Sequence, residues 1–266
     1  MSLKQMIKPY VPSSFLKARS YVRKKIGMNE GSITEFEFDP AGDVQRDIES
    51  KFKFDGDLLN IFVNNKGSAV HKWHHYIPIY DRYFSKFRGT KVKFLEIGVS
   101  KGGSLQMWRS YFGPEATIYG IDINPACRAL DGVSGHVRIG SQDDKEFLES
   151  VIFEMGGVDI VLDDGSHHMD HIPKSLEAIF MHMSEGGIYM IEDLSTAYWS
   201  QYGGGYYSKQ NFFNYIKSLI DDIHFWYHRR GVNHSISMKC SGIHIHDSIV
   251  VLEKNTIFKP VHSIIK

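Results

Sequence analysis

The sequence predicts an α/β fold with a doubly wound, mostly parallel sheet, and three observations support it. The chain has 266 residues, which is enough for one generous α/β domain with an extension. Short apolar runs alternate with helical patterns from Lys91 through Tyr227, as they do in parallel sheets with helices on both faces. The last two strand-like segments follow one another with no helix between them, so at least one should run antiparallel.

The expected elements follow in order along the chain. Aromatic and apolar residues at helical spacing predict a first helix over 71–87, which Gly89 ends. Seven strands are expected, at 91–99, 116–123, 136–140, 158–165, 186–194, 235–240 and 247–254. Further helices are expected at 105–112, from 143–144 onward, at 171–183 and at 210–227. We interpret 1–65, which is polar and irregular, as an N-terminal extension, and 66–266 as the domain.

Composition excludes several classes of function. Lys+Arg and Asp+Glu both number 31, so the chain has no net charge that would favour nucleic acid. No apolar run reaches the ~18–20 residues of a transmembrane helix, and the basic N-terminus lacks the apolar core of a secretory signal. The only cysteines, Cys127 and Cys240, are expected to be reduced thiols in a cytoplasmic protein.

The first strand ends in a glycine-rich loop that predicts a nucleotide site. The loop runs from Glu96 through Gly98 to Ser104, where glycines allow a sharp turn and close approach of a ligand. Glu96 would repel a pyrophosphate but attract a cation, and Asp122 at the end of the second strand can accept hydrogen bonds from ribose hydroxyls. This combination suits an adenosine that carries a sulfonium better than a nicotinamide dinucleotide, whose G-x-G-x-x-G pattern is absent.

Acidic residues and histidines follow the fourth and fifth strands. Asp164 follows one strand, and Glu192 and Asp193 follow the next. Neighbouring parallel strands end at the same edge, so these carboxylates should converge, and oxygen-only ligands suit Mg²⁺ or a similar divalent cation. His167 lies three residues after Asp164, and an imidazole can take a proton from an alcohol at neutral pH. The sequence therefore predicts a metal-assisted transfer to a hydroxyl with His167 as the general base.

The loop and strand ends together resemble a known family. The segments FLEIGVSKGGSLQMW, IYGIDI, DIVLDDGSHH, GGIYMIEDL and DSIVVLEK resemble the class I S-adenosylmethionine (SAM) dependent sugar O-methyltransferases of macrolide biosynthesis. Related groups are the rhamnosyl O-methyltransferases and the cephalosporin hydroxylase-like proteins. The resemblance implies a Rossmann-like seven-stranded sheet, SAM and Mg²⁺ as cofactors, and a glycoside or polysaccharide acceptor. A homo-oligomer is left open.

The resemblance also assigns site residues. It implies that Asp164, Glu192 and Asp193 bind the metal and that His167 is the catalytic base. The residues expected to contact SAM are Glu96, Gly98, Ser104, Asp122, Ser141, Gln142, Asp163 and, more weakly, Tyr76. His74 is expected to lie over the cofactor in the same segment as Tyr76. Loop 198–207, rich in tyrosine and glycine, is expected to bind the acceptor.

Several alternatives stay open at this point. Ser141 or Asp143 could cap the following helix instead of touching the adenine base. The segment that carries Tyr76 could simply pack aromatic side chains against the sheet. Asp164, His167 and either His168 or His171 could form a two-histidine, one-carboxylate iron site of a hydroxylase. The protein could also bind SAM without catalysing a reaction.

Overall fold

The computed structural model describes residues 33–228 and 230–265. The chain divides into two compact units, Met1–Asp39 and Pro40–Lys266. In the first unit the described residues include one 3₁₀-helix, η2 (Ile33–Phe36). The second unit begins earlier than the boundary expected at residue 65, because helices α2 (Val44–Phe52) and α3 (Asp57–Val63) belong to it. Among the described residues no helix is long and apolar enough to cross a membrane.

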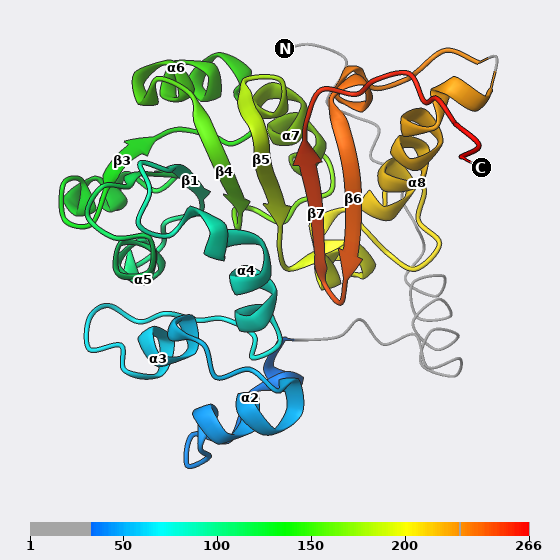
Figure 1. The fold of residues 1–266 in the computed structure, drawn as a ribbon. Coiled ribbons are helices and arrows are strands. Elements are labelled where there is room, and N and C mark those ends of the chain that lie inside the picture. The colour runs from blue at the N-terminus through cyan, green and yellow to red at the C-terminus, as the bar shows by residue number, and fades with distance from the viewer. Residues whose placement is uncertain (1–32, 229, 266) are drawn as a thin grey trace, which may run out of the picture. The chain divides into compact units, whose positions relative to one another are not determined.

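A seven-stranded sheet organises the second unit, in the order β3-β2-β1-β4-β5-β7-β6 (Figure 1). The strands are β1 (Lys93–Ile97), β2 (Thr117–Asp122), β3 (His136–Ile139), β4 (Val158–Asp163), β5 (Met183–Ile191), β6 (Cys240–His246) and β7 (Ile249–Lys254). Strands β1 to β5 pair in parallel, and β7 runs antiparallel to both β5 and β6. The predicted doubly wound sheet with an antiparallel closing strand is confirmed.

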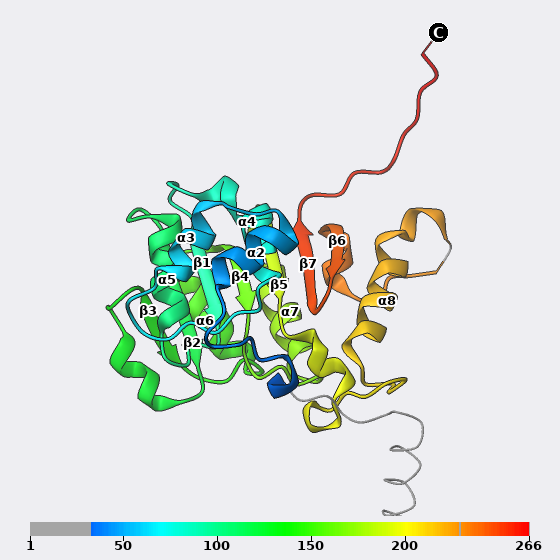
Figure 2. The ribbon, with the colours of Figure 1, turned by 90° about the horizontal axis from the view of Figure 1, so that it is seen from below.

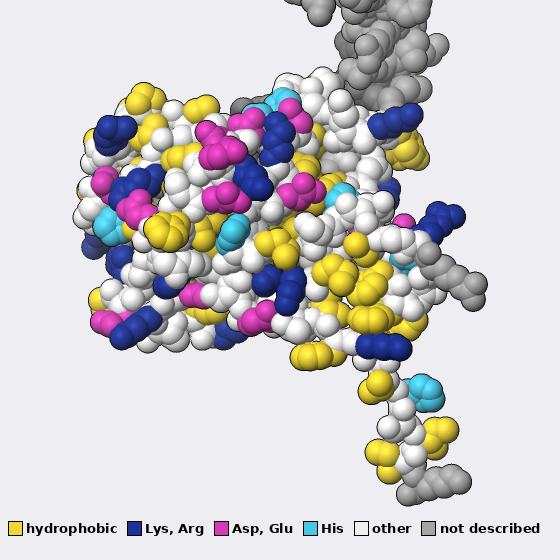
Figure 3. Space-filling model, turned by 90° about the horizontal axis from the view of Figure 1, so that it is seen from above, with side chains coloured by type: hydrophobic (Ala, Val, Ile, Leu, Met, Phe, Trp, Pro, Cys, Tyr) yellow, Lys and Arg dark blue, Asp and Glu magenta, His cyan; other side chains and the backbone are white. Residues whose placement is uncertain are grey.

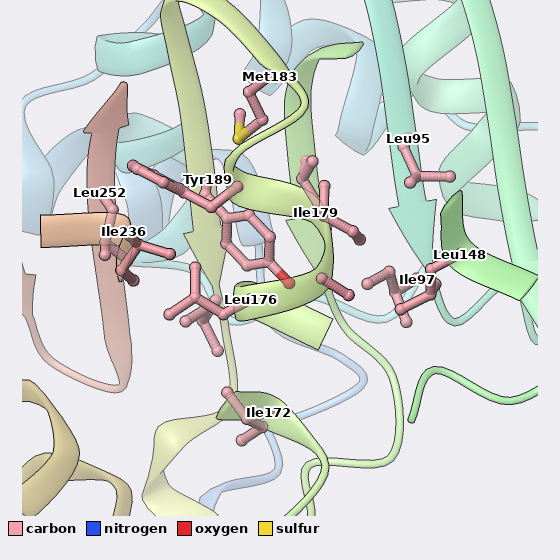
Figure 4. Packing of buried hydrophobic residues seen from close by; sticks show 14 of the residues in the cluster. Leu95, Ile97, Leu148, Ile172, Leu176, Ile179, Met183, Tyr189, Ile236 and Leu252 are labelled. Carbon is pink, nitrogen blue, oxygen red and sulfur yellow. The ribbon is translucent and has the colours of Figure 1, made fainter. Parts of the chain in front are cut away.

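Helices cover both faces of the sheet. The helices are α4 (Tyr76–Phe84), α5 (Gly103–Phe112), α6 (Lys145–Met155), α7 (Ile172–Phe180) and α8 (Phe212–Ile223). Alternate residues of each strand point to opposite faces, so that Phe94 packs with α4 and α5 while Leu95 packs with α6 and α7. Figure 2 looks onto the carboxyl ends of β1, β4 and β5 and separates the two layers, and Figure 4 shows the packing around α7.

Two expected elements differ in the structure. The helix expected over 71–87 begins only at Tyr76, because 71–73 have no regular structure and His74 and His75 form a turn, and a 3₁₀-helix, η3 (Ser85–Phe87), follows its end at Phe84. The strand expected over 235–240 is wrong, because Ser235–Met238 forms a 3₁₀-helix and β6 starts at Cys240. The cause is Asp222, whose buried carboxylate accepts hydrogen bonds from the backbone of His234 (2.8 Å) and fixes a turn there.

Charge and cysteines agree with the expectations from composition. Figure 3 shows a face on which acidic and basic side chains alternate without a large area of one sign. Cys127 and Cys240 are both buried and free. A reducing location remains a prediction.

Candidate functional site

Gly98 allows the loop after β1 to cross the end of β4. Its φ is +97°, and a Cβ at this position would lie 2.1 Å from the carbonyl oxygen of Asp164. Its N–H donates to the carbonyl of Ile121 at 2.8 Å, which fixes the turn to the neighbouring strand. Only glycine fits, because any side chain would collide with the backbone that carries the expected metal ligand.

Gly98→Ala is expected to weaken SAM binding by at least about tenfold and to cost about 1–3 kcal/mol of stability through strain and displacement of the loop. Calorimetry with SAM and urea unfolding measure both effects. The matched control is Gly113→Ala, because Gly113 has a similar φ of +92° with no atom within 4 Å of its virtual Cβ. Equal changes in SAM affinity and in stability in the two variants would show that the close approach of Gly98 to Asp164 is not needed for SAM binding.

Asp122 holds the same loop from the end of β2. Its Oδ2 accepts hydrogen bonds from the N–H groups of Val99 (3.0 Å) and Ser100 (2.9 Å), and its Oδ1 accepts from Asn124 (2.8 Å). A carboxylate has about four lone-pair positions, so it can still accept from a ligand hydroxyl. Asp122 lines the two pockets that flank this loop, in agreement with its predicted place.

The smaller pocket, of about 170 Å³, lies between the ends of β1, β2 and β3 and contains both predicted base contacts. Ser141 and Gln142 line it together with apolar Ile97, Ile121 and Ile123. Asp144 caps α6 by accepting from Phe147 N–H at 3.0 Å, so Ser141 and Asp143 are not the cap. An apolar slot with a few polar groups suits a heteroaromatic base.

Asp163 does not line this pocket but contacts Gln142, which does. The side chain is 2% exposed and accepts from Ser175 Oγ (2.7 Å), Tyr189 OH (3.1 Å) and Gln142 Nε2 (3.2 Å). Gln142 in turn accepts from the N–H of Ser166 at 2.6 Å. These partners of Asp163 are all internal, and its direct contact with the cofactor stays a prediction.

The larger pocket, of about 480 Å³, contains the predicted catalytic residues. Asp164, His167, Asp193 and Ser104 line it, and Gly98 and Asp122 lie in its wall as well as in that of the smaller pocket. Parallel pairing of β4 and β5 places Asp163 opposite Ile191, so the residues after each strand leave the sheet side by side. The convergence expected from sequence is thus observed.

His167 faces both carboxylates. Its Nε2 lies 3.7 Å from Asp164 Oδ1 and 3.9 Å from Asp193 Oδ2. One ligand atom from each residue lies within 4.8 Å of the others. His167 and Asp193 both have positive φ, +54° and +57°, an unusual conformation for residues other than glycine that turns these side chains toward the pocket.

Lys72, which the sequence analysis missed, is a buried cation within the acidic cluster. Its Nζ pairs with Asp164 at 2.5 Å and also with Glu192, and the lysine side chain is 3% exposed. Burial alone would lower the pKa of Lys72, but the two carboxylates raise it above its ordinary value. Burial would likewise raise the pKa of Asp164, and the ammonium lowers it instead. In the sequence Lys72 lies within the expected aromatic helix 71–87, and no motif there indicates that it pairs with distant carboxylates.

Glu192 pairs with this lysine and lines neither the smaller nor the larger pocket. It is 1% exposed, and its two oxygens are engaged by Lys72 and by the hydroxyl of Tyr80. Burial and the nearby Asp164 raise the pKa of the Glu192 carboxyl well above its ordinary value. Glu192 would reach a cation only after giving up one of these partners, so its role as a ligand stays a prediction.

Tyr76 supports Asp193 through a hydrogen bond. Its hydroxyl and Trp73 Nε1 both donate to Asp193 Oδ1, each at 2.9 Å, and the Tyr76 side chain is buried. This leaves Asp193 Oδ2 to face His167. His74 lies away from the pockets and pairs with Asp47 at 2.8 Å. A cofactor contact by Tyr76 therefore stays a prediction.

Glu96 is sealed beneath the glycine loop. It is 0% exposed and accepts from Ser104 Oγ at 2.8 Å and from Trp108 Nε1 at 3.3 Å. Ser104 donates to this carboxyl and lines the larger pocket, whereas Glu96 does not line it, so a direct contact of Glu96 with the ligand stays a prediction. Burial raises the pKa of Glu96 to about 7.

The raised pKa of Glu96 predicts a pH dependence of stability. Between its ordinary pKa of 4.5 and about 7 the folded protein binds a proton that the unfolded chain releases. The contribution of protonated Glu96 to the stability of the fold is therefore fully present below pH 4.5, and it is lost as the pH rises through about 7. Glu96→Gln should remove this loss, which amounts to roughly 3 kcal/mol at most. Urea midpoints of both proteins across this range measure it, and parallel pH profiles would contradict the assignment.

The donor set fits one hard divalent cation. Asp164 Oδ1 and Asp193 Oδ2 face the same space, which is the oxygen chemistry that Mg²⁺ prefers. The hydroxylase alternative loses support, because the metal-ligand side chains of the described residues form two separate groups. Asp164, His167 and Asp193 form one with a single histidine, while His168 and His171 belong to the other.

Comparison with known proteins finds similarity to methyltransferases. A family model described as a methyltransferase domain matches residues 95–194. The 8-demethyl-8-(2-methoxy-alpha-L-rhamnosyl)-tetracenomycin-C 3'-O-methyltransferase of Streptomyces olivaceus is 36% identical over 75% of this chain and 54% of its own length. The mycinamicin VI 2''-O-methyltransferase of Micromonospora griseorubida is 37% identical over 68% of this chain and 48% of its own length.

A solved structure is similar as well. The MycE methyltransferase of the mycinamycin pathway, in complex with Mg, SAH and mycinamycin VI, is 34% identical with a TM-score of 0.68. The match covers 76% of this chain and 54% of that one. The chain thus spans about half the length of these relatives.

Proposed function

This chain is related to the SAM-dependent O-methyltransferases that modify sugars of glycosylated natural products, and on that premise we propose that it methylates a sugar hydroxyl with the help of a divalent cation. One observation carries the proposal. His167 Nε2 lies within 4 Å of Asp164 and Asp193 in a pocket that shares Gly98 and Asp122 with the base-sized pocket. The proton acceptor and the acidic pair therefore lie beside the nucleotide loop.

Different residues of the chain would bind SAM, hold the cation and take the proton. Asp122, Ser141 and Gln142 would bind the adenosine part of SAM, and Asp164 and Asp193 would hold the cation. A divalent cation in such a site lowers the pKa of a hydroxyl that it contacts. His167 Nε2 would take the hydroxyl proton while the sugar oxygen forms its bond to the methyl carbon. The carbon–sulfur bond breaks, its electron pair stays on sulfur, and S-adenosylhomocysteine is released.

Loop 198–207 is proposed to contact the acceptor. Tyr202 lies with its ring 6.4 Å from that of His167, at an angle of 67°. Tyr198, Tyr206 and Tyr207 are exposed, which suits stacking on sugar faces. No residue of loop 198–207 is among those that line the larger pocket, and the ring contact of Tyr202 with His167 connects the loop to the proposed reaction centre.

Methyl transfer from methyl-labelled SAM to rhamnosyl and other deoxysugar glycosides tests the proposal. We expect labelled product in the presence of Mg²⁺ and its loss when EDTA removes the cation, with recovery when Mg²⁺ is restored. Full activity in EDTA would remove the metal from the mechanism. Labelling of the aglycone rather than the sugar would contradict the acceptor class.

A further inference from the structure

A second group of metal-ligand side chains lies in the turn before α7, outside the reaction pocket. His168, Asp170 and His171 each offer one ligand atom, and the three atoms lie within 4.8 Å of one another. His168 Nδ1 contacts Asp170 Oδ1, and His171 Nε2 lies 3.9 Å from that same oxygen. Their side chains are 30% to 64% exposed, so an ion from solvent can reach them.

The backbone holds this turn in one conformation. The N–H of His171 donates to the carbonyl of His168 at 3.0 Å, which brings the two rings to a centroid distance of 5.2 Å. Between them, Met169 is 4% exposed, and its N–H donates to the carbonyl of Tyr202 at 2.9 Å. A site of this kind gains affinity because its ligands are already gathered before the ion arrives.

The second nitrogen of His171 is also oriented. Its Nδ1 lies 2.9 Å from Ser166 Oγ, which leaves Nε2 directed toward Asp170 and toward Asp143 Oδ2 at 3.7 Å. Ser166 is itself fixed by Gln142. Histidine ligands of metals usually have such an outer partner, because it fixes the ring and its tautomer. Asp143 supplies a further negative charge, partly offset by Lys174 at 3.3 Å.

We propose that His168, Asp170 and His171 bind a transition-metal dication of the zinc type. Two imidazoles and one carboxylate are the donors that Zn²⁺ accepts, with water in the fourth position, whereas Mg²⁺ prefers oxygen alone. Ligand atoms around a tetrahedral Zn²⁺ lie roughly 3.4 Å apart at bond lengths of about 2.1 Å. The His171–Asp170 separation of 3.9 Å is near that value, and the His168–Asp170 contact would open to reach it.

The site is distinct from the proposed magnesium site in donors and in place. Asp164 and Asp193 face the larger pocket, while His171 and Ser166 line the base-sized pocket on the other side of Gly98. An ion at His171 would therefore lie against the wall of that pocket. This inference stands on the geometry of the turn and does not depend on the proposed methyl transfer.

Calorimetric titration of the full, tag-free chain with Zn²⁺ in millimolar Mg²⁺ tests the site. We expect one equivalent of Zn²⁺ to bind, and Asp170→Asn and His168→Gln to weaken that binding by at least about tenfold. The matched control is His182→Gln, because His182 is a half-exposed histidine that pairs with Glu149 at 3.4 Å. Circular dichroism confirms that each variant is folded.

A further variant separates the two metal sites. Asp164→Asn should keep the zinc affinity of the wild-type protein, since Asp164 belongs to the other group of ligands. The proposal is overturned if no stoichiometric zinc binding occurs, if neither turn variant weakens it, or if Asp164→Asn abolishes it. In the last case the ion would belong to the reaction pocket.

Discussion

His167→Ala is expected to lower kcat for methyl transfer by about 10²- to 10⁴-fold, the usual contribution of a positioned general base. Of the two histidines that line the larger pocket, His71 and His167, only His167 belongs to the group of ligand atoms with Asp164 and Asp193. SAM affinity should change little, because the nucleotide contacts come from the other side of the Gly98 loop. Initial rates at saturating SAM, together with calorimetry of SAM binding, separate the two effects.

The control for this prediction is His136→Ala. His136 is 55% exposed in its side chain and lies at the far strand β3, beside Asp131. Its replacement should leave kcat unchanged. If His167→Ala retained wild-type turnover, the general base would have to be another group. A pure rise in KM without loss of kcat would assign His167 to acceptor binding.

Lys72→Met is expected to destabilise the protein by about 3 kcal/mol, because it leaves the buried carboxylate of Glu192 and the partly buried one of Asp164 without their cation. Lys72 is 3% exposed in its side chain and contacts both Asp164 and Glu192. Urea unfolding measures the change in free energy of unfolding. The control is Lys51→Met, since Lys51 is 60% exposed and its pair with Asp47 should contribute less than about 1 kcal/mol.

The double variant Lys72→Met/Glu192→Gln tests the cause of that loss. Removing the Glu192 charge together with the lysine should recover part of the stability, because one buried carboxylate then no longer needs a cation. A double variant as unstable as the sum of the single ones would show that packing, not charge, explains the effect. An unchanged stability of Lys72→Met would contradict the structure of the cluster.

The sequence was informative where local patterns determine the structure. Strand ends are marked by apolar runs that stop at acidic residues, so Asp164 and Asp193 could be placed at one edge and were found there. The turn at Ser235 could not be foreseen, because it depends on Asp222, more than ten residues away. The alternation of polar and apolar residues over 235–240, which is typical of a strand, was overridden by this buried carboxylate.

The surroundings of the site residues could not be predicted for the same reason. Glu96, Tyr76 and Asp163 have the residue types of ligand contacts, but their burial depends on which side chains cover them in three dimensions. Lys72 joins Asp164 and Glu192 across 92 and 120 positions of sequence. No spacing rule relates a lysine just before α4 to acids at two strand ends.

The central claim is that the ends of β1, β4 and β5 form one SAM site with a cation beside it. Calorimetric titration with SAM and with NADH, each with and without Mg²⁺, tests it most directly. The account predicts one SAM bound per chain, little heat from NADH, and loss of SAM binding in Gly98→Ala. Tight binding of NADH with no binding of SAM would contradict it.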